Sequence, residues 1–197
     1  MSRSLVAKVI YRWSVLLRNT EAAELIEFAV SLPLLVVFMV GIFDFSSAFV
    51  LKQNIAHVAA EAARITANQP MSDVANPGSC PVSICAVRDV VDRALTNNGI
   101  PDCGLSGATP VGPAGLAWTF SANSCSAGSL TLTIDRGYTY TTNLAAPFQA
   151  PYTIEATKVT LSYPHQWQFD KVITLILPGA NYANSPVQSV AIMQNLN

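Results

Sequence analysis

The sequence predicts an α+β protein in which a long N-terminal helix, partly embedded in a membrane, packs on a small antiparallel β-sheet. Three observations carry this prediction: an apolar run at 28–51, an alanine-rich amphipathic continuation, and short β-prone runs beyond residue 115. Helical periodicity therefore gives way to alternation of apolar and polar residues along the chain. We expect a basic leader at 1–22, the long helix at 23–69 and a folded α+β domain at 70–197.

The bulk composition favours a membrane-anchored domain over a nucleic-acid-binding protein. The 197 residues have a formal net charge of -1, and 12% of them are charged. Soluble domains usually contain about 25% charged residues, so part of this chain is expected to meet lipid. Because there is no basic excess, nucleic acid is not predicted as a partner.

Residues 28–51 are the membrane-spanning candidate. A helix of this length crosses a hydrocarbon core of about 30 Å, and Asp44 is its only charged residue. Two alternatives fit this segment less well. A core helix would normally carry a polar face, which residues 28–51 lack. The apolar part of a cleaved secretory signal is usually about 7 to 15 residues long, which is shorter than this run. Basic residues precede the span, so we predict one pass with a cytoplasmic N-terminus and an extracytoplasmic C-terminal domain. They are Arg3, Lys8, Arg12 and Arg18.

Two helices are expected. The long one begins near Thr20 and should be kinked at Pro33, because proline removes a backbone donor and clashes with the preceding turn. Pro70 and the turn residues after it end this helix. A shorter helix is predicted at 82–97, where apolar residues recur every three or four positions, and we expect it to cap a sheet.

The C-terminal region is predicted to hold an irregular loop and several short strands. The loop covers 101–115, which is rich in glycine and proline. We expect a tight hairpin at 135–137, an irregularity near Lys158, and a buried segment at 172–177 that is either strand or helix. The predicted strands are 117–120, 130–135, 138–142, 153–162 and 187–193.

The chain contains four cysteines in its extracytoplasmic part. That compartment is oxidising, so we predict two disulfides. Three pairings are open to four cysteines, and the sequence does not choose among them. A metal site is not predicted, because the sequence has no CxxC pair and both histidines lie far from the cysteines. The cysteines are Cys80, Cys85, Cys103 and Cys125.

No catalytic motif is recognisable in the sequence. It contains no GxSxG, HExxH, phosphate-binding or dinucleotide-binding signature, so we predict neither enzymatic activity nor a cofactor. Four C-terminal aromatic residues could stack on a ligand, but aromatics in a small sheet domain more often belong to its core. These residues are Tyr163, Trp167, Phe169 and Tyr182.

Two carboxylates at the apolar run need an explanation. Glu27 stands directly before the run and Asp44 lies in its outer half. An ionised group in hydrocarbon is costly unless it is paired, so we expect Asp44 to face another helix, a polar group or a water pocket. The alternative for Asp44 is an interfacial position near the outer headgroups. The alternative for Glu27 is a simple interaction with the N–H groups of the first helical turn.

Several stretches of the long helix resemble the TadE-like family. They are the tripeptide Glu27-Phe28-Ala29, Pro33, the sequence GIFDF at 41–45 and the sequence AAEAAR at 59–64. The resemblance covers about residues 21–67, and a weaker similarity continues in the C-terminal strands. It implies a pilin-like architecture for the whole chain.

The resemblance implies a minor pilin or pseudopilin that helps to assemble a tight-adherence pilus of the Flp type (type IVb), which serves adhesion. Its partners would be the Flp-type major pilin, another minor pilin, the pilus assembly platform and a prepilin peptidase. Its location would be the bacterial inner membrane, with incorporation into a surface pilus as a later step.

The resemblance also implies roles for individual residues. Glu27 would neutralise the new N-terminal amine of a neighbouring subunit, and we group Asp44 and Pro33 with it as candidates for assembly and helix register. The family spacing places the peptidase cut between Ala22 and Ala23. The family usually has glycine before the cut, whereas this chain has Ala22, so an unprocessed, membrane-anchored form is the alternative.

A function of a different class is also open. The C-terminal domain could be an extracytoplasmic binding or adhesin module for which the helix is only a tether. Exposed aromatic side chains on one face of the sheet would favour that function.

Overall fold

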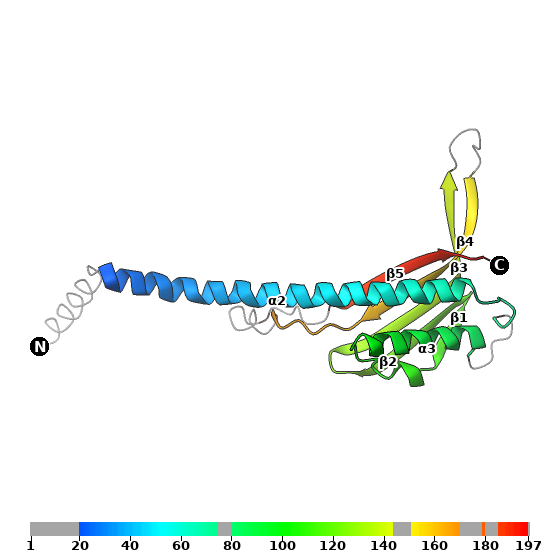
Figure 1. The fold of residues 1–197 in the computed structure, drawn as a ribbon, viewed down its shortest axis with the longest axis horizontal. Coiled ribbons are helices and arrows are strands. Elements are labelled where there is room, and N and C mark those ends of the chain that lie inside the picture. Colours follow the sequence, from blue (N-terminus) through cyan, green and yellow to red (C-terminus); the bar gives the residue numbers. More distant parts are fainter. Residues whose placement is uncertain (1–19, 75–79, 144–150, 170–178, 180–184, 197) are drawn as a thin grey trace, which may run out of the picture.

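The fold is a long helical shaft with a sheet domain packed along one end of it (Figure 1). A computed structural model describes residues 20–74, 80–143, 151–169, 179 and 185–196. The α+β prediction is confirmed. The elements are α2 (Thr20–Ala67), α3 (Val82–Asn97), the 3-10 turn η1 (Leu105–Gly107), β1 (Pro110–Ala114), β2 (Ala117–Cys125), β3 (Gly128–Asn143), β4 (Pro151–Tyr163) and β5 (Val187–Gln194).

Helix α2 has two halves with different surroundings. Its N-terminal half is long and apolar enough to cross a membrane, and the most apolar window is not covered by any described part of the chain. Its C-terminal half turns a stripe of Ile55, Val58, Ala59 and Ala62 into the core of the domain. The helix continues through Pro33, where a kink is expected from the sequence, and α2 is assigned as one uninterrupted helix (Figure 1).

The sheet is an antiparallel meander with the strand order β1-β2-β3-β4-β5. Alternate residues of its strands point toward α2 and α3, as the period of two requires. Trp118 and Phe120 of β2 and Leu132 and Ile134 of β3 are fully buried there, and Val159 of β4 joins them. One hydrophobic core therefore lies between the two helices and the sheet.

The hairpin predicted at 135–137 is wrong, because β3 runs through these residues without turning. Asp135 pairs with Lys158 and Tyr138 pairs with Ala156, so two residues of β3 oppose one residue of β4. The turn-prone sequence serves a β-bulge instead of a hairpin, and the N–H of Gly137 donates to the Asp135 carboxylate at 3.0 Å. The irregularity expected near Lys158 lies opposite this bulge.

The loop predicted at 101–115 is also partly wrong, because it contains η1 and the edge strand β1. β1 carries Pro110 and Pro113, and among the described strands it pairs only with β2. An edge strand tolerates proline, since the missing N–H would have had no neighbouring strand to bond. The second helix was predicted at 82–97 and is α3, with the same bounds. The segment at 172–177 lies outside the described residues.

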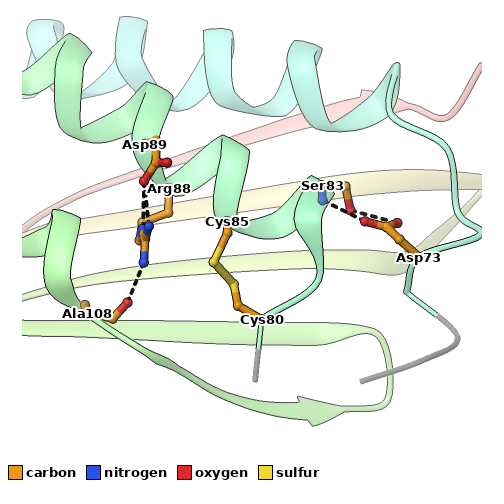
Figure 2. Close-up of a disulfide and its surroundings, with 7 residues drawn as sticks. All are labelled: Asp73, Cys80, Ser83, Cys85, Arg88, Asp89 and Ala108. Atoms are coloured by element: carbon orange, nitrogen blue, oxygen red, sulfur yellow. Dashed lines mark hydrogen bonds and ion pairs between the residues drawn. A yellow bond between two sulfur atoms is a disulfide. The ribbon is translucent and has the colours of Figure 1, made fainter. Parts of the chain in front are cut away.

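Two disulfides are formed, as predicted, and the pairing is Cys80 with Cys85 and Cys103 with Cys125. The first holds the start of α3 (Figure 2). There the Asp73 carboxylate accepts the N–H of Ser83 at 2.7 Å and its hydroxyl at 3.0 Å. Burial alone would raise the pKa of Asp73, but these two hydrogen bonds, a hydrogen bond from the backbone of Asp73 itself and the charge of Arg136 together lower that pKa. Asp73 thus stabilises the N-terminal end of α3.

Candidate functional site

Glu27 lies on the bare, apolar half of α2. Its side chain is exposed, and it is surrounded by exposed apolar neighbours such as Ile26, Phe28 and Val30. Within the described part of the chain, Glu27 has no ion-pair partner. Because this carboxylate is exposed, groups outside the chain can reach it.

The candidate processing site lies in the same helix. Ala22 and Ala23 are within α2, and Pro33 follows about three turns later. Ala23 is exposed. The structure thus places the proposed cut, Glu27 and Pro33 along one continuous helix, and their roles remain predictions.

Asp44 is buried, with an exposed fraction of only 4%, although it lies within the apolar run. The backbone N–H of Phe169 donates to its Oδ2 atom at 2.9 Å. The Nε2 atom of His165 lies 3.7 Å from its Oδ1 atom. Asp44 therefore meets polar groups of its own chain, from a segment that follows β4.

That segment, residues 164–169, is called the strap below. It leaves the sheet at the end of β4 and runs along α2 toward the apolar half of the helix (Figure 1). The Trp167 ring lies 5.7 Å from that of Phe45 and 4.8 Å from that of His165, measured between ring centroids. A Cβ atom added to Gly41 would lie 3.5 Å from the Phe169 ring, so the small residue at 41 permits close contact.

The aromatic residues singled out in the sequence do not form one site. Tyr163 belongs to the core, as expected. Trp167 and Phe169 lie on α2 outside that core, so the core interpretation is wrong for them. Tyr182 lies outside the described residues. Only the need of Asp44 for a polar partner points to the strap in the sequence, and it does so indirectly.

Arg136 is a buried residue whose importance the sequence did not indicate. It sits in the bulge of β3 with an exposed fraction of 1%. Its guanidinium donates to the carbonyl of Gln69 at 2.6 Å and to that of Pro70 at 3.0 Å, just beyond the end of α2. Burial lowers the pKa of Arg136, and the charge of Asp73 partly offsets this. A cation at this position also complements the helix dipole.

Lys52 ties the middle of α2 to the sheet. It is the first basic residue after the apolar run, and its ammonium group donates to the backbone carbonyl of Gln188 in β5. This contact marks the level at which the sheet domain begins along the helix.

Three acidic residues gather beside α3. Asp89 and Asp92 belong to the helix and Asp102 to the loop after it. Burial, followed by the carboxyl group of Asp102 and the charge of Asp89, raises the pKa of Asp92. At neutral pH the ionised carboxylates of Asp89 and Asp102 therefore repel that of Asp92.

Replacing Asp92 with asparagine should therefore stabilise the domain at neutral pH. The pKa of Asp92 is raised above its ordinary value of 3.8 on folding, so its contribution to stability is present below that pH and is lost as the pH rises through the folded-state pKa. We expect D92N to be more stable than the parent at pH 7 by less than about 1 kcal/mol. Urea unfolding of D92N and the parent, from below pH 3.8 up to pH 7, measures the difference between their free energies of unfolding. This difference should vanish in acid, and equal stability of the two proteins at pH 7 would contradict the expectation.

The described residues contain no group of three or more histidine, cysteine or acidic side chains that could hold a metal ion. All four cysteines are consumed in disulfides. His57 is exposed on α2, and His165 faces Asp44.

Residues 23–64 match the protein-family model described as TadE-like protein. The resemblance noted in the sequence is confirmed over this segment, which lies within α2 and contains Glu27, Pro33 and Asp44. The sheet domain lies outside the match. Neither the curated proteins nor the solved structures contain a match to the chain.

Proposed function

We propose, from the TadE-like segment at 23–64, that this chain is a minor pilin or pseudopilin that takes part in assembling a tight-adherence pilus. The match fits a protein associated with such a pilus. The observation that carries the finer proposal is the bare apolar half of α2 with Glu27 exposed upon it. A surface of this kind requires lipid or the helices of other subunits around it.

In this proposal α2 first anchors the subunit as a single-pass protein of the inner membrane and then packs against neighbouring helices. The basic residues before the apolar run support a cytoplasmic N-terminus. The two disulfides support an oxidising, extracytoplasmic location for the sheet domain. The Flp-type major pilin, a second minor pilin and the assembly platform are the proposed partners.

Glu27 is the proposed register residue. If a prepilin peptidase cuts between Ala22 and Ala23, a new amine arises on each subunit four residues before Glu27. A carboxylate and an amine that leave water together gain most by pairing with each other. Such a pair would fix the axial offset between adjacent subunits. The intact mass of the protein purified from membranes tests the cut, because processing removes residues 1–22.

Replacing Glu27 with alanine should leave membrane insertion unchanged and reduce the number of pili per cell at least about tenfold, the effect of losing roughly 1.4 kcal/mol per subunit contact. Counting pili by electron microscopy and measuring the membrane-bound fraction check both halves of this expectation. Glu27→Asp is the matched control, because it keeps the charge and should restore part of the piliation. Normal piliation of the alanine variant would remove the role proposed for Glu27.

A second candidate function, an extracytoplasmic binding or adhesin module, is favoured by one specific feature. The β3–β4 ribbon projects away from the helices beyond the bulge (Figure 1). Tyr140 and Tyr152 are exposed on it. Tyr140 pairs with Ile154, and Thr142 pairs with Tyr152, so the two tyrosines share one face of the ribbon.

Replacing Tyr140 and Tyr152 together with serine should distinguish the two functions. An adhesin module would lose surface attachment by at least about tenfold, the loss that roughly 1.4 kcal/mol of binding free energy produces, while the number of pili stays constant. An assembly component would retain attachment per pilus. Thr139 and Thr141, on the opposite face of the same strand, provide the matched control pair for substitution.

A further inference from the structure

We infer that the strap, residues 164–169, is itself embedded in the outer leaflet of the membrane beside α2, with Asp44 as the site on the helix that receives it. The inference rests on the membrane-spanning role of α2 in the proposed function. It adds a second lipid-facing surface to a chain whose apolar helix alone would otherwise contact the bilayer. We choose the lipid of the outer leaflet as the surroundings of the strap because the strap lies against the outer half of the apolar span of α2.

The strap contacts α2 well toward the N-terminal side of the sheet domain. Lys52 bonds to Gln188 at the near end of the sheet, whereas the end of the strap touches α2 at Asp44 and beside Gly41. At 1.5 Å rise per residue, these positions lie about 12 and 16 Å beyond Lys52 toward the N-terminus. One leaflet of the hydrocarbon core is about 15 Å thick. A span that ends near Lys52 thus places Asp44 within the outer leaflet and the contact beside Gly41 at about the middle of the bilayer.

The carboxylate of Asp44 needs polar contacts at this depth. A carboxylate at that depth is costly when it faces acyl chains. The strap reduces this cost by covering Asp44 and by donating the Phe169 N–H to it at 2.9 Å. His165 adds a second polar group at 3.7 Å. The strap therefore has to lie at the same depth as the carboxylate that it covers.

The exposed side chains of the strap carry no charge. Trp167 is half-buried, and its indole N–H donates to the Ser185 carbonyl at 3.1 Å. Its ring therefore presents apolar atoms beside Phe45, which is 67% exposed. The two exposed glutamines of the strap are uncharged, so no isolated ion has to enter the leaflet; they are Gln166 and Gln168.

Quenching of tryptophan fluorescence by lipids brominated on the acyl chain tests the location of Trp167. The chain has three tryptophans, so the full-length variant W13F, reconstituted in lipid vesicles, retains Trp118 and Trp167. Trp118 is 1% exposed in the sheet domain and serves as the internal reference. We expect brominated phosphatidylcholine to remove most of the emission that distinguishes W13F from W13F/W167F. The emission of W13F/W167F should be unchanged.

Two results would overturn the inference, and they differ in what else they overturn. If both variants resist extraction by alkaline carbonate but are quenched equally little, α2 spans the membrane and the strap lies in water. If the protein is extracted by carbonate, the membrane anchor and the function proposed from it fail together with the inference.

Variants of Asp44 in the W13F background test the docking site separately. Asp44→Ala removes the acceptor for the Phe169 N–H, so Trp167 should lose lipid quenching and become accessible to acrylamide in the water phase. Asp44→Asn keeps an oxygen acceptor at the same place and should retain most of the lipid quenching. Equal lipid quenching of the alanine variant and its parent would show that Asp44 does not hold the strap.

Discussion

Replacing Arg136 with methionine should lower the free energy of unfolding by about 3 kcal/mol, the usual consequence of removing one partner from a buried, charge-assisted contact. Methionine fills a similar volume but leaves the carbonyls of Gln69 and Pro70 without the two donors that they have now. Part of this loss is offset, because a buried guanidinium no longer has to be desolvated. Urea unfolding of the full-length protein in detergent micelles, followed by tryptophan fluorescence, measures the change.

Arg136→Lys is the matched control for this experiment. Lysine keeps the positive charge near the end of α2 but cannot donate to two carbonyls in the forked geometry of arginine. We expect it to retain about half of the stabilisation. If the methionine variant is as stable as the parent, the contact between the bulge and the helix end does not contribute to folding.

Local patterns were sufficient for the helices and for most of the strands. The bounds of α3 follow from its apolar spacing, and the bare and buried halves of α2 follow from the composition of each half. Asp and Gly favour turns, so the residues around Arg136 predict a hairpin where β3 instead contains a bulge. Whether such residues turn the chain or widen a strand depends on the partner strand, which a local pattern does not contain.

Contacts between distant residues could not be predicted for the same reason. Asp44 was expected to need a polar partner, and it has one, but Phe169 is 125 residues away in the sequence. Arg136 meets Gln69 across 67 residues. Four cysteines allow three pairings, and only the fold brings Cys103 next to Cys125.

These long-range contacts fix α2 to the sheet domain at several levels. Arg136 holds the end of the helix, Lys52 holds its middle and Asp44 holds its membrane side. Because these contacts are spread along α2, they oppose rotation of the helix against the sheet domain. In the proposed function, the register set at Glu27 would therefore also fix the position of the sheet domain on the outside of the assembly.

Removing the disulfide between Cys103 and Cys125 with a double serine variant should lower the free energy of unfolding by about 3 kcal/mol. The bond closes a loop of 22 residues, so its loss releases more conformational entropy in the unfolded chain than the loss of a short loop does. It also anchors the loop before η1 to the end of β2, where Cys103 is buried in the core. The measurement is the urea midpoint at constant unfolding slope.

The second disulfide provides the matched comparison. Cys80 and Cys85 are only five residues apart, and the same entropic relation gives about 2 kcal/mol for their removal. The ratio of the two losses is thus the informative quantity, because both variants replace two cysteines with two serines. A larger loss at Cys80 and Cys85 would show that the start of α3, and not the junction of η1 with β2, limits the stability of the domain.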